Sequence, residues 1–340
     1  MKPRGFSLIE LTVAMGISVV AIAAVMMVLT SAATMSGNAE QRADGDQAAR
    51  YAAEGLLRSI REAGLGASGG IMVGSGAGAA SRINAVFGRD GTGWGSSDEL
   101  WVVSPDKNTF GETCVDSGAA TTITTAAASG PITVGCITGF KAGQMLLASD
   151  MTSAALLTNV SMAGQVIDYA ESGTSGFADS TAGYKQSDWV FGASVWHYFV
   201  ALDGQNRPAL YRSAATLGAG AGGVPFVDSG TPVLVASGIE DLQLAYGLDA
   251  AGSNDPANYV FQNGLNASYT PGLRSVRLSL VSVTGKTIRN FQVKTSSDRD
   301  LRPLDAVENH VHAPAAAVDG LRRSLYQRRV ELPNMATGVL

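Results

Sequence analysis

The sequence predicts an α+β protein in which one long N-terminal α-helix packs against a β-rich, largely antiparallel globular head. Three patterns indicate this fold. Residues 11–35 carry no charged side chain, so an apolar run of membrane length lies near the start of the chain. An apolar stripe with a spacing of four residues follows it as far as residue 63. Several short segments after residue 63 are aliphatic or aromatic, or alternate at period two, which is typical of strands.

The apolar run from Leu11 to Met35 is long enough to cross a bilayer. As a helix it spans roughly 38 Å, against a hydrocarbon core of about 30 Å. Lys2 and Arg4 precede it, and basic residues favour the cytoplasmic side, so the rest of the chain is expected to face outward. A secretory signal peptide cut near residues 31–33 and a simple uncleaved anchor are the alternatives. Neither explains Glu10 at the head of the run.

The helix is expected to continue beyond the membrane as an amphipathic stalk. Its apolar stripe consists of Ala48, Ala52, Leu56 and Ile60, widened by Ala49, Ala53 and Leu57. Gly64 and Gly66 are natural terminators. We therefore expect a transmembrane and assembly helix over residues 6–35, a stalk over 36–63 and a head over 64–340, with one or two subdomains.

The head is expected to consist of short strands joined by glycine-rich loops, since the chain contains 41 glycines among 340 residues. The strand-like segments are Glu99–Val103, Gln144–Ala148, Val195–Ala201, Ala209–Arg212, Leu242–Leu248 and Val276–Leu280. The last two alternate aliphatic with polar or small residues. These segments predict an antiparallel β domain packed on the upper stalk.

Residues 5–10, Gly-Phe-Ser-Leu-Ile-Glu, resemble the class III leader of type IV pilins and type II secretion pseudopilins. The resemblance implies that residues 1–5 are a leader, that a prepilin peptidase cuts after Gly5, and that it methylates the new N-terminus at Phe6. It also implies that Glu10 serves subunit assembly by pairing with the N-terminal ammonium of a neighbour. Opposite charges ~4 Å apart attract by about 4 kcal/mol at an effective dielectric near 20.

Later segments extend this resemblance. Residues 198–201, 208–212, 238–247, 273–280 and the arginine-rich ending 321–330 are similar to strands of PilW-type minor pilins. Secretion pseudopilins of the J class share the layout but are usually shorter. The glycine-rich loops and residues 247–271 do not align.

The resemblance implies a non-catalytic minor pilin that inserts in the inner membrane and primes or caps type IV pilus assembly. The implied partners are the prepilin peptidase, other minor pilins, the major pilin, the inner-membrane assembly platform and a PilY-type tip adhesin. The head would lie in the periplasm and later at the pilus tip on the cell surface. A J-type secretion pseudopilin is the alternative within this class. A membrane-anchored periplasmic enzyme is the competing class, but the sequence offers no clustered nucleophile and base.

Cys114 and Cys136 are the two cysteines of the chain. An even pair in an exported domain predicts a disulfide, and two buried thiols are the alternative. Closing a loop of about 23 residues would stabilise the fold by roughly 3 kcal/mol.

No metal, cofactor or nucleic acid is expected. The three histidines are distant from one another in sequence, no Cys-x-x-Cys occurs, and residues 203–206 and 254–255 are expected to form turns rather than a calcium site. The formal net charge is −5, whereas a general nucleic-acid binder is normally basic. Arginines 322, 323, 328 and 329 form a local cluster, which we expect to be a solvated strand face.

Overall fold

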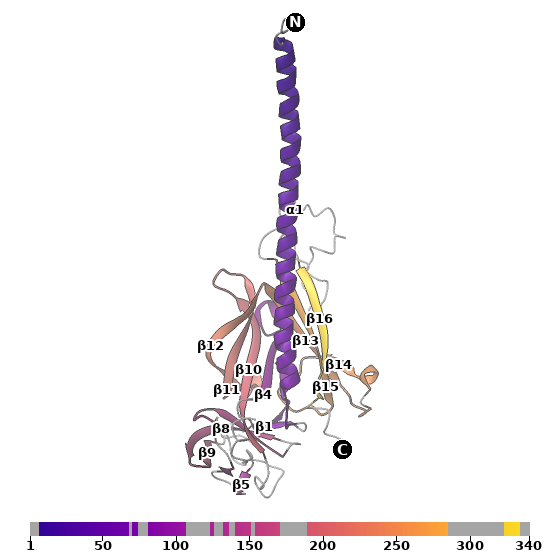
Figure 1. Cartoon of the computed structure of the whole chain (residues 1–340). Helices are drawn as coiled ribbons and strands as arrows, with labels where there is room; N and C mark the ends of the chain where they lie inside the picture. Colours follow the sequence, from indigo (N-terminus) through magenta and orange to yellow (C-terminus); the bar gives the residue numbers. More distant parts are fainter. Residues whose placement is uncertain are drawn as a thin grey trace.

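The head of the protein packs against one face of the second half of one long helix (Figure 1). The computed structural model describes residues 7–67, 70–73, 81–106, 123–125, 132–135, 140–150, 154–170, 189–253, 255–284 and 323–333. Helix α1 runs from Leu8 to Glu62. Beyond it Gly64 and Gly66 have φ of 69° and 75°, a left-handed conformation that favours glycine and ends the helix. The predicted α+β fold is confirmed.

The strands of the head confirm the predicted segments and extend most of them. They are β1 (Ile71–Val73), β2 (Ser81–Ile83), β3 (Val86–Arg89), β4 (Glu99–Pro105), β5 (Ile123–Thr125), β6 (Ile132–Val134), β7 (Met145–Ser149), β8 (Ala154–Ala163), β9 (Val166–Ala170), β10 (Trp189–Leu202), β11 (Pro208–Leu217), β12 (Phe226–Ser237), β13 (Ile239–Leu248), β14 (Val260–Asn263), β15 (Leu273–Val283) and β16 (Arg323–Glu331). Short 3-10 helices are η1 (Trp94–Ser96), η4 (Ala221–Gly223) and η5 (Pro256–Asn258).

Within the described residues, the strands form a 12-stranded and a 4-stranded sheet. The smaller sheet has the order β14-β13-β15-β16 and is antiparallel. In the larger sheet β10 is the central strand, because it pairs with β4, β7 and β11. The strands pair antiparallel throughout except for β1 with β8, which are parallel. Strand β12 lies at one end of this sheet.

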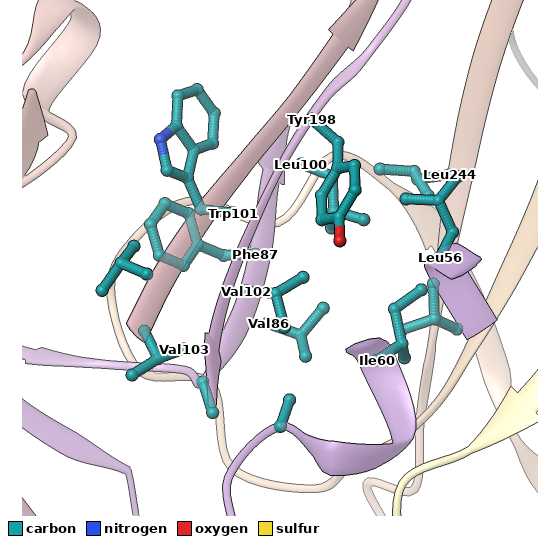
Figure 2. Packing of buried hydrophobic residues seen from close by; sticks show 14 of the residues in the cluster. Leu56, Ile60, Val86, Phe87, Leu100, Trp101, Val102, Val103, Tyr198 and Leu244 are labelled. Atoms are coloured by element: carbon teal, nitrogen blue, oxygen red, sulfur yellow. The ribbon is translucent and has the colours of Figure 1, made fainter. Parts of the chain in front are cut away.

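The main hydrophobic core lies around the second half of α1, where the two sheets meet the helix. Ala52, Leu56 and Ile60 of the predicted stripe are fully buried, and Ala48 is half-buried. Figure 2 shows the side chains around Leu56 and Ile60, which include Val86, Leu100, Val102, Tyr198 and Leu244. The hydroxyl groups of Ser59 and Tyr198 lie 2.7 Å apart and join α1 to β10. The stripe therefore holds the head on the helix, since burying one Leu or Ile side chain contributes about 1.5–3 kcal/mol.

A second, smaller core lies in the distal part of the head. Its members are Ile132, Val134, Phe140, Leu146, Ala148, Ala155, Leu157, Ile167 and Val190. Strand β7 faces both cores, because Leu147 belongs to the main core and Leu146 to the distal one, and successive side chains of a strand point to opposite faces. A continuous sheet thus links the two cores.

Strands β13 and β15 are buried on both faces, including the face that carries their polar and small residues. Gln243 and Ser279 occupy polar positions and are nonetheless buried. The side-chain amide of Gln243 donates to the carbonyl of Ser96, and that of Gln327 donates to the hydroxyl of Ser279. The amide nitrogen of Gln243 and the hydroxyl of Ser279 are thus hydrogen-bonded inside the head, as is usual for buried polar groups.

Asp98 joins the turn before β4 to the smaller sheet. Its N–H donates to the carbonyl of Leu242 at 2.8 Å. Its carboxylate accepts from the N–H groups of Leu244 at 2.8 Å and Gly91 at 2.9 Å. Burial raises the pKa of this carboxyl from its ordinary value of 3.8 to about 7. We therefore expect the stability of the contact between the two sheets to depend on pH.

Gly88 of β3 lies where the larger sheet meets Tyr246 of β13. A methyl group in place of its hydrogen would lie 2.4 Å from the hydroxyl oxygen of Tyr246 and 2.5 Å from the carbonyl oxygen of Glu99. The hydroxyl of Tyr246 is buried and has no hydrogen-bond partner within the described residues. Glycine is required here by the close approach of a backbone and a ring.

We expect Gly88→Ala to destabilise the head by about 1–3 kcal/mol, because the added methyl overpacks the seam between the sheets. Tyr246→Phe removes the unpaired hydroxyl and is expected to be nearly neutral, and in the double variant it should recover part of the loss. Gly55→Ala on α1 is the matched control, since its methyl meets nothing within 4 Å and should stabilise the helix slightly. Urea unfolding of the full chain in detergent measures these changes; equal effects of Gly88→Ala and Gly55→Ala would contradict the account.

Candidate assembly surface

The first half of α1 is apolar, and the described part of the head does not cover it. Its side chains are exposed, for example Leu8 at 81% and Val20 at 70%. The most apolar 18-residue window of α1 has a mean hydropathy of 2.5, and none of it is buried. By length and composition this half of the helix can cross a membrane. An apolar helix face left bare by its own head requires lipid or other protein to cover it.

Three hydroxyl groups within this apolar half donate to carbonyl groups of the helix itself. The hydroxyl of Thr12 donates to the carbonyl of Ile9 at 2.9 Å, that of Ser18 to Ala14 at 2.8 Å, and that of Thr30 to Met26 at 2.9 Å. Because an unpaired polar group is costly in hydrocarbon, these bonds make the segment compatible with a bilayer.

Glu10 lies in the first turn of α1 and closes a capping box. Its carboxylate accepts from the N–H of Ser7 at 3.1 Å, and the hydroxyl of Ser7 accepts from the N–H of Ile9 at 3.3 Å. Two of the free N–H groups at the helix start are thereby satisfied. Our sequence interpretation missed this role, although Ser-x-x-Glu before an apolar run is its signal. Glu10 is exposed and each carboxylate oxygen accepts more than one bond, so the cap leaves it accessible to a neighbour.

The other predicted site residues of the N-terminus and the cysteine pair lie outside the described residues. This applies to Gly5 and Phe6, the expected cleavage and methylation positions, and to Cys114 and Cys136. Cleavage, methylation and the disulfide stay predictions. A cut after Gly5 would preserve the peptide N–H of Ser7 that the carboxylate of Glu10 binds.

Asp203 forms a turn, as predicted. Its carboxylate accepts from the backbone N–H groups of Gln205 and Arg207 and from the guanidinium of Arg207. The backbone N–H of Arg207 is the main reason that the pKa of this carboxyl is lowered. In the part of the chain that the structure describes, no three His, Cys, Asp or Glu side chains gather where they could hold a metal ion.

Of the four C-terminal arginines, Arg322 lies outside the described residues, and the other three do not form one basic patch. Arg323 binds the carboxylate of Glu240 with N–O distances of 2.5 and 2.8 Å, and Arg329 pairs with Glu331 at 2.8 Å. Arg328 and Arg329 are neighbours on β16 and therefore point to opposite faces of the sheet. Two of the arginines are thus paired with carboxylates.

His197 and Asp228 form the one pair in the described chain that resembles part of a catalytic group. The Nδ1 atom of His197 lies 2.9 Å from a carboxylate oxygen of Asp228. The imidazole stacks on Trp101 at 4.2 Å and lies 4.8 Å from the ring of Phe199. Burial lowers the pKa of His197, against the opposing effect of Asp228. The imidazole belongs to a row of stacked aromatic side chains. We therefore interpret His197 as a residue that packs within the head.

Residues 197–334 match the family model of type IV pilus-assembly protein W, PilW. This stretch, from the second half of β10 to just beyond β16, is less than half of the chain. It contains all the later segments whose similarity to PilW-type strands the sequence indicated, and that resemblance is confirmed.

Among solved structures, the chain is similar to the type IV-like pilin TTHA1219 from Thermus thermophilus. The identity is 18%, over 58% of this chain and 86% of that one, with a TM-score of 0.26. A TM-score this low supports no structural conclusion. A comparison with curated proteins finds no match.

Proposed function

We propose that this PilW-like chain is a minor pilin of a type IV pilus. In this proposal a prepilin peptidase removes residues 1–5 and methylates Phe6, and the apolar half of α1 then holds the protein in the inner membrane. The protein joins other minor pilins, primes or caps the filament and stays near its tip. Its further partners would be the major pilin, the assembly platform and a PilY-type tip adhesin.

The observation that carries this proposal is the division of α1 into two halves. One face of the second half is buried against the head, whereas the first half is apolar and bare from Leu8 onwards. A soluble protein would not leave such a surface exposed. A helix of this kind can be stored in a membrane and then packed among the helices of neighbouring subunits. The match of residues 197–334 to PilW supports a pilus in preference to the secretion pseudopilus.

The proposed role is structural rather than catalytic. Glu10 supplies the register between neighbouring helices, and the head supplies contacts to other subunits. The head would face the periplasm before assembly, because the basic residues Lys2 and Arg4 precede the membrane run and basic residues favour the cytoplasmic side.

Mass spectrometry of the N-terminal peptide, from membrane and sheared-surface fractions, tests the proposal. We expect a chain that starts at methylated Phe6. A start near Ala33 or Thr34 would identify a secretory signal peptide, and an intact Met1 would identify a simple anchor; either would overturn the proposal.

We expect Gly5→Val to block processing completely, since a branched side chain would occupy the position before the proposed cut. The variant should keep Met1 and stay in the membrane fraction, as read from its intact mass. Gly16→Val, which places the same change within the helix, is the control and should be processed normally. Normal processing of Gly5→Val would contradict the proposed cleavage position.

A further inference from the structure

A groove of about 690 Å³ lies between the last turns of α1 and strand β12. Its volume is in the range of known ligand pockets, about 300–1,000 Å³. One wall is formed by α1 with Tyr51 and Arg58, and the other by residues 233–235 of β12. Trp196 of β10 and Arg212 of β11 line the space between these walls. The groove is separate from the apolar half of α1.

Among the described residues, no hydrogen-bond acceptor is found for the buried Nε atom of Arg212. The guanidinium group stacks on the ring of Trp196 at 4.1 Å, and the side chain is half-buried. A buried donor on a charged group is costly to leave unpaired, so such a group requires an explanation. The planar stack holds the guanidinium fork ready for a carboxylate.

The charges on the helix wall do not supply this acceptor. Glu62 forms an ion pair with Arg58 at 3.2 Å. Glu54 is exposed, and water screens an exposed carboxylate. Among the described residues, no carboxylate forms an ion pair with Arg212, whereas the other arginine of the groove, Arg58, is paired with Glu62.

The strand wall of the groove is an open sheet edge. Strand β12 pairs with β11 on one side, and within the described chain no strand pairs with its other side. Val233 and Leu234 are 56% and 49% exposed. An unpaired edge presents backbone N–H and C=O groups to another strand, and exposed aliphatic side chains beside it offer apolar contacts to that strand.

We propose that this groove binds an extended, acidic segment of a partner protein, which adds as a strand to the edge of β12. One carboxylate of the segment forms a bidentate pair with Arg212 above the ring of Trp196. Its aliphatic side chains pack on Val233 and Leu234. The edge and the aliphatic wall favour a peptide over a small anion, which would use Arg212 alone. The proposal does not depend on Glu10 or on leader processing.

The test uses the full chain in detergent micelles and a labelled, blocked nine-residue peptide. Threonine and valine alternate in the peptide around one central glutamate; a second peptide has glutamine there. We expect the glutamate peptide to bind at least tenfold more tightly by fluorescence anisotropy, since a charged hydrogen bond contributes about 1.5–3 kcal/mol. Arg212→Gln should remove this preference. Equal affinities of the two peptides for the unaltered protein would overturn the carboxylate contact.

Arg328→Gln is the matched control, because Arg328 is also an arginine over an aromatic ring, 5.9 Å from that of Tyr326. It should leave binding unchanged, and an equal loss in both variants would identify a general charge effect and overturn the site.

Strand addition is tested by N-methylating alternate amides of the peptide. One set should abolish binding and the other spare it, because a strand offers one edge. Binding unaffected by either set, or full displacement by free glutarate, would overturn strand addition.

Discussion

Glu10→Val is expected to insert in the membrane and to be processed like the unaltered protein, but to be absent from sheared filaments. The apolar run behind it is unchanged, so insertion is preserved. The variant loses the carboxylate that we propose pairs with the N-terminal ammonium of a neighbouring subunit. That attraction is about 4 kcal/mol for charges ~4 Å apart at an effective dielectric near 20. We therefore expect at least a tenfold fall in incorporation, measured by immunoblotting of sheared and membrane fractions.

The capping box gives Glu10 a second, local role, and two further variants separate the roles. Glu10→Gln keeps a side chain that can close the box but removes the charge, so it should fail like Glu10→Val. Ser7→Ala removes the hydroxyl that accepts from Ile9 and keeps the charge. It should enter filaments normally, because fraying one turn of a 55-residue helix changes little of its packed surface. Normal incorporation of Glu10→Gln would mean that the cap matters and that the register argument is wrong.

Local periodicity was sufficient to predict the helix and the strands used most heavily in the core. The stripe through Leu56 and Ile60 was correctly assigned to the buried face of α1, because a spacing of four places side chains on one helix face. Leu244 and Leu278 were placed on one face of their strands for the corresponding reason at period two. In each case the information lies within a few neighbouring residues.

Contacts between distant residues were not predictable in this way. The carboxylate of Asp98 meets the N–H of Leu244, and nothing near either residue indicates the other. The approach of Gly88 to Tyr246 and the stack of Arg212 on Trp196 depend likewise on sheet order and register. The burial of polar strand positions such as Ser279 was not predictable either, because a pattern reports which residues share a face, not what covers that face.

The unfolding free energy of the head is expected to fall as pH rises from about 4 to 7, because of Asp98. Burial raises the pKa of its carboxyl to about 7, and the Asp90 and Asp241 carboxylates act in the same direction, against the two backbone N–H donors. Between the ordinary pKa of 3.8 and about 7, the folded protein holds a proton that the unfolded chain has released. Stability therefore decreases with pH across this window and is level on either side. The change due to Asp98 is about 4 kcal/mol.

Asp98→Asn should remove this slope, since asparagine cannot ionise. At pH 8 the variant avoids a buried charge, whereas at pH 4 it resembles the protonated aspartate, so the difference between the two proteins must change with pH. Urea unfolding of the full chain in detergent at pH 4, 6 and 8 measures it, with Asp46→Asn on the exposed face of α1 as the control. Parallel pH profiles for the unaltered protein and Asp98→Asn would show that the carboxyl titrates as it does in the unfolded chain. The two N–H donors would then offset the whole effect of burial on this carboxyl, and Asp98 would add nothing to the pH dependence of the head.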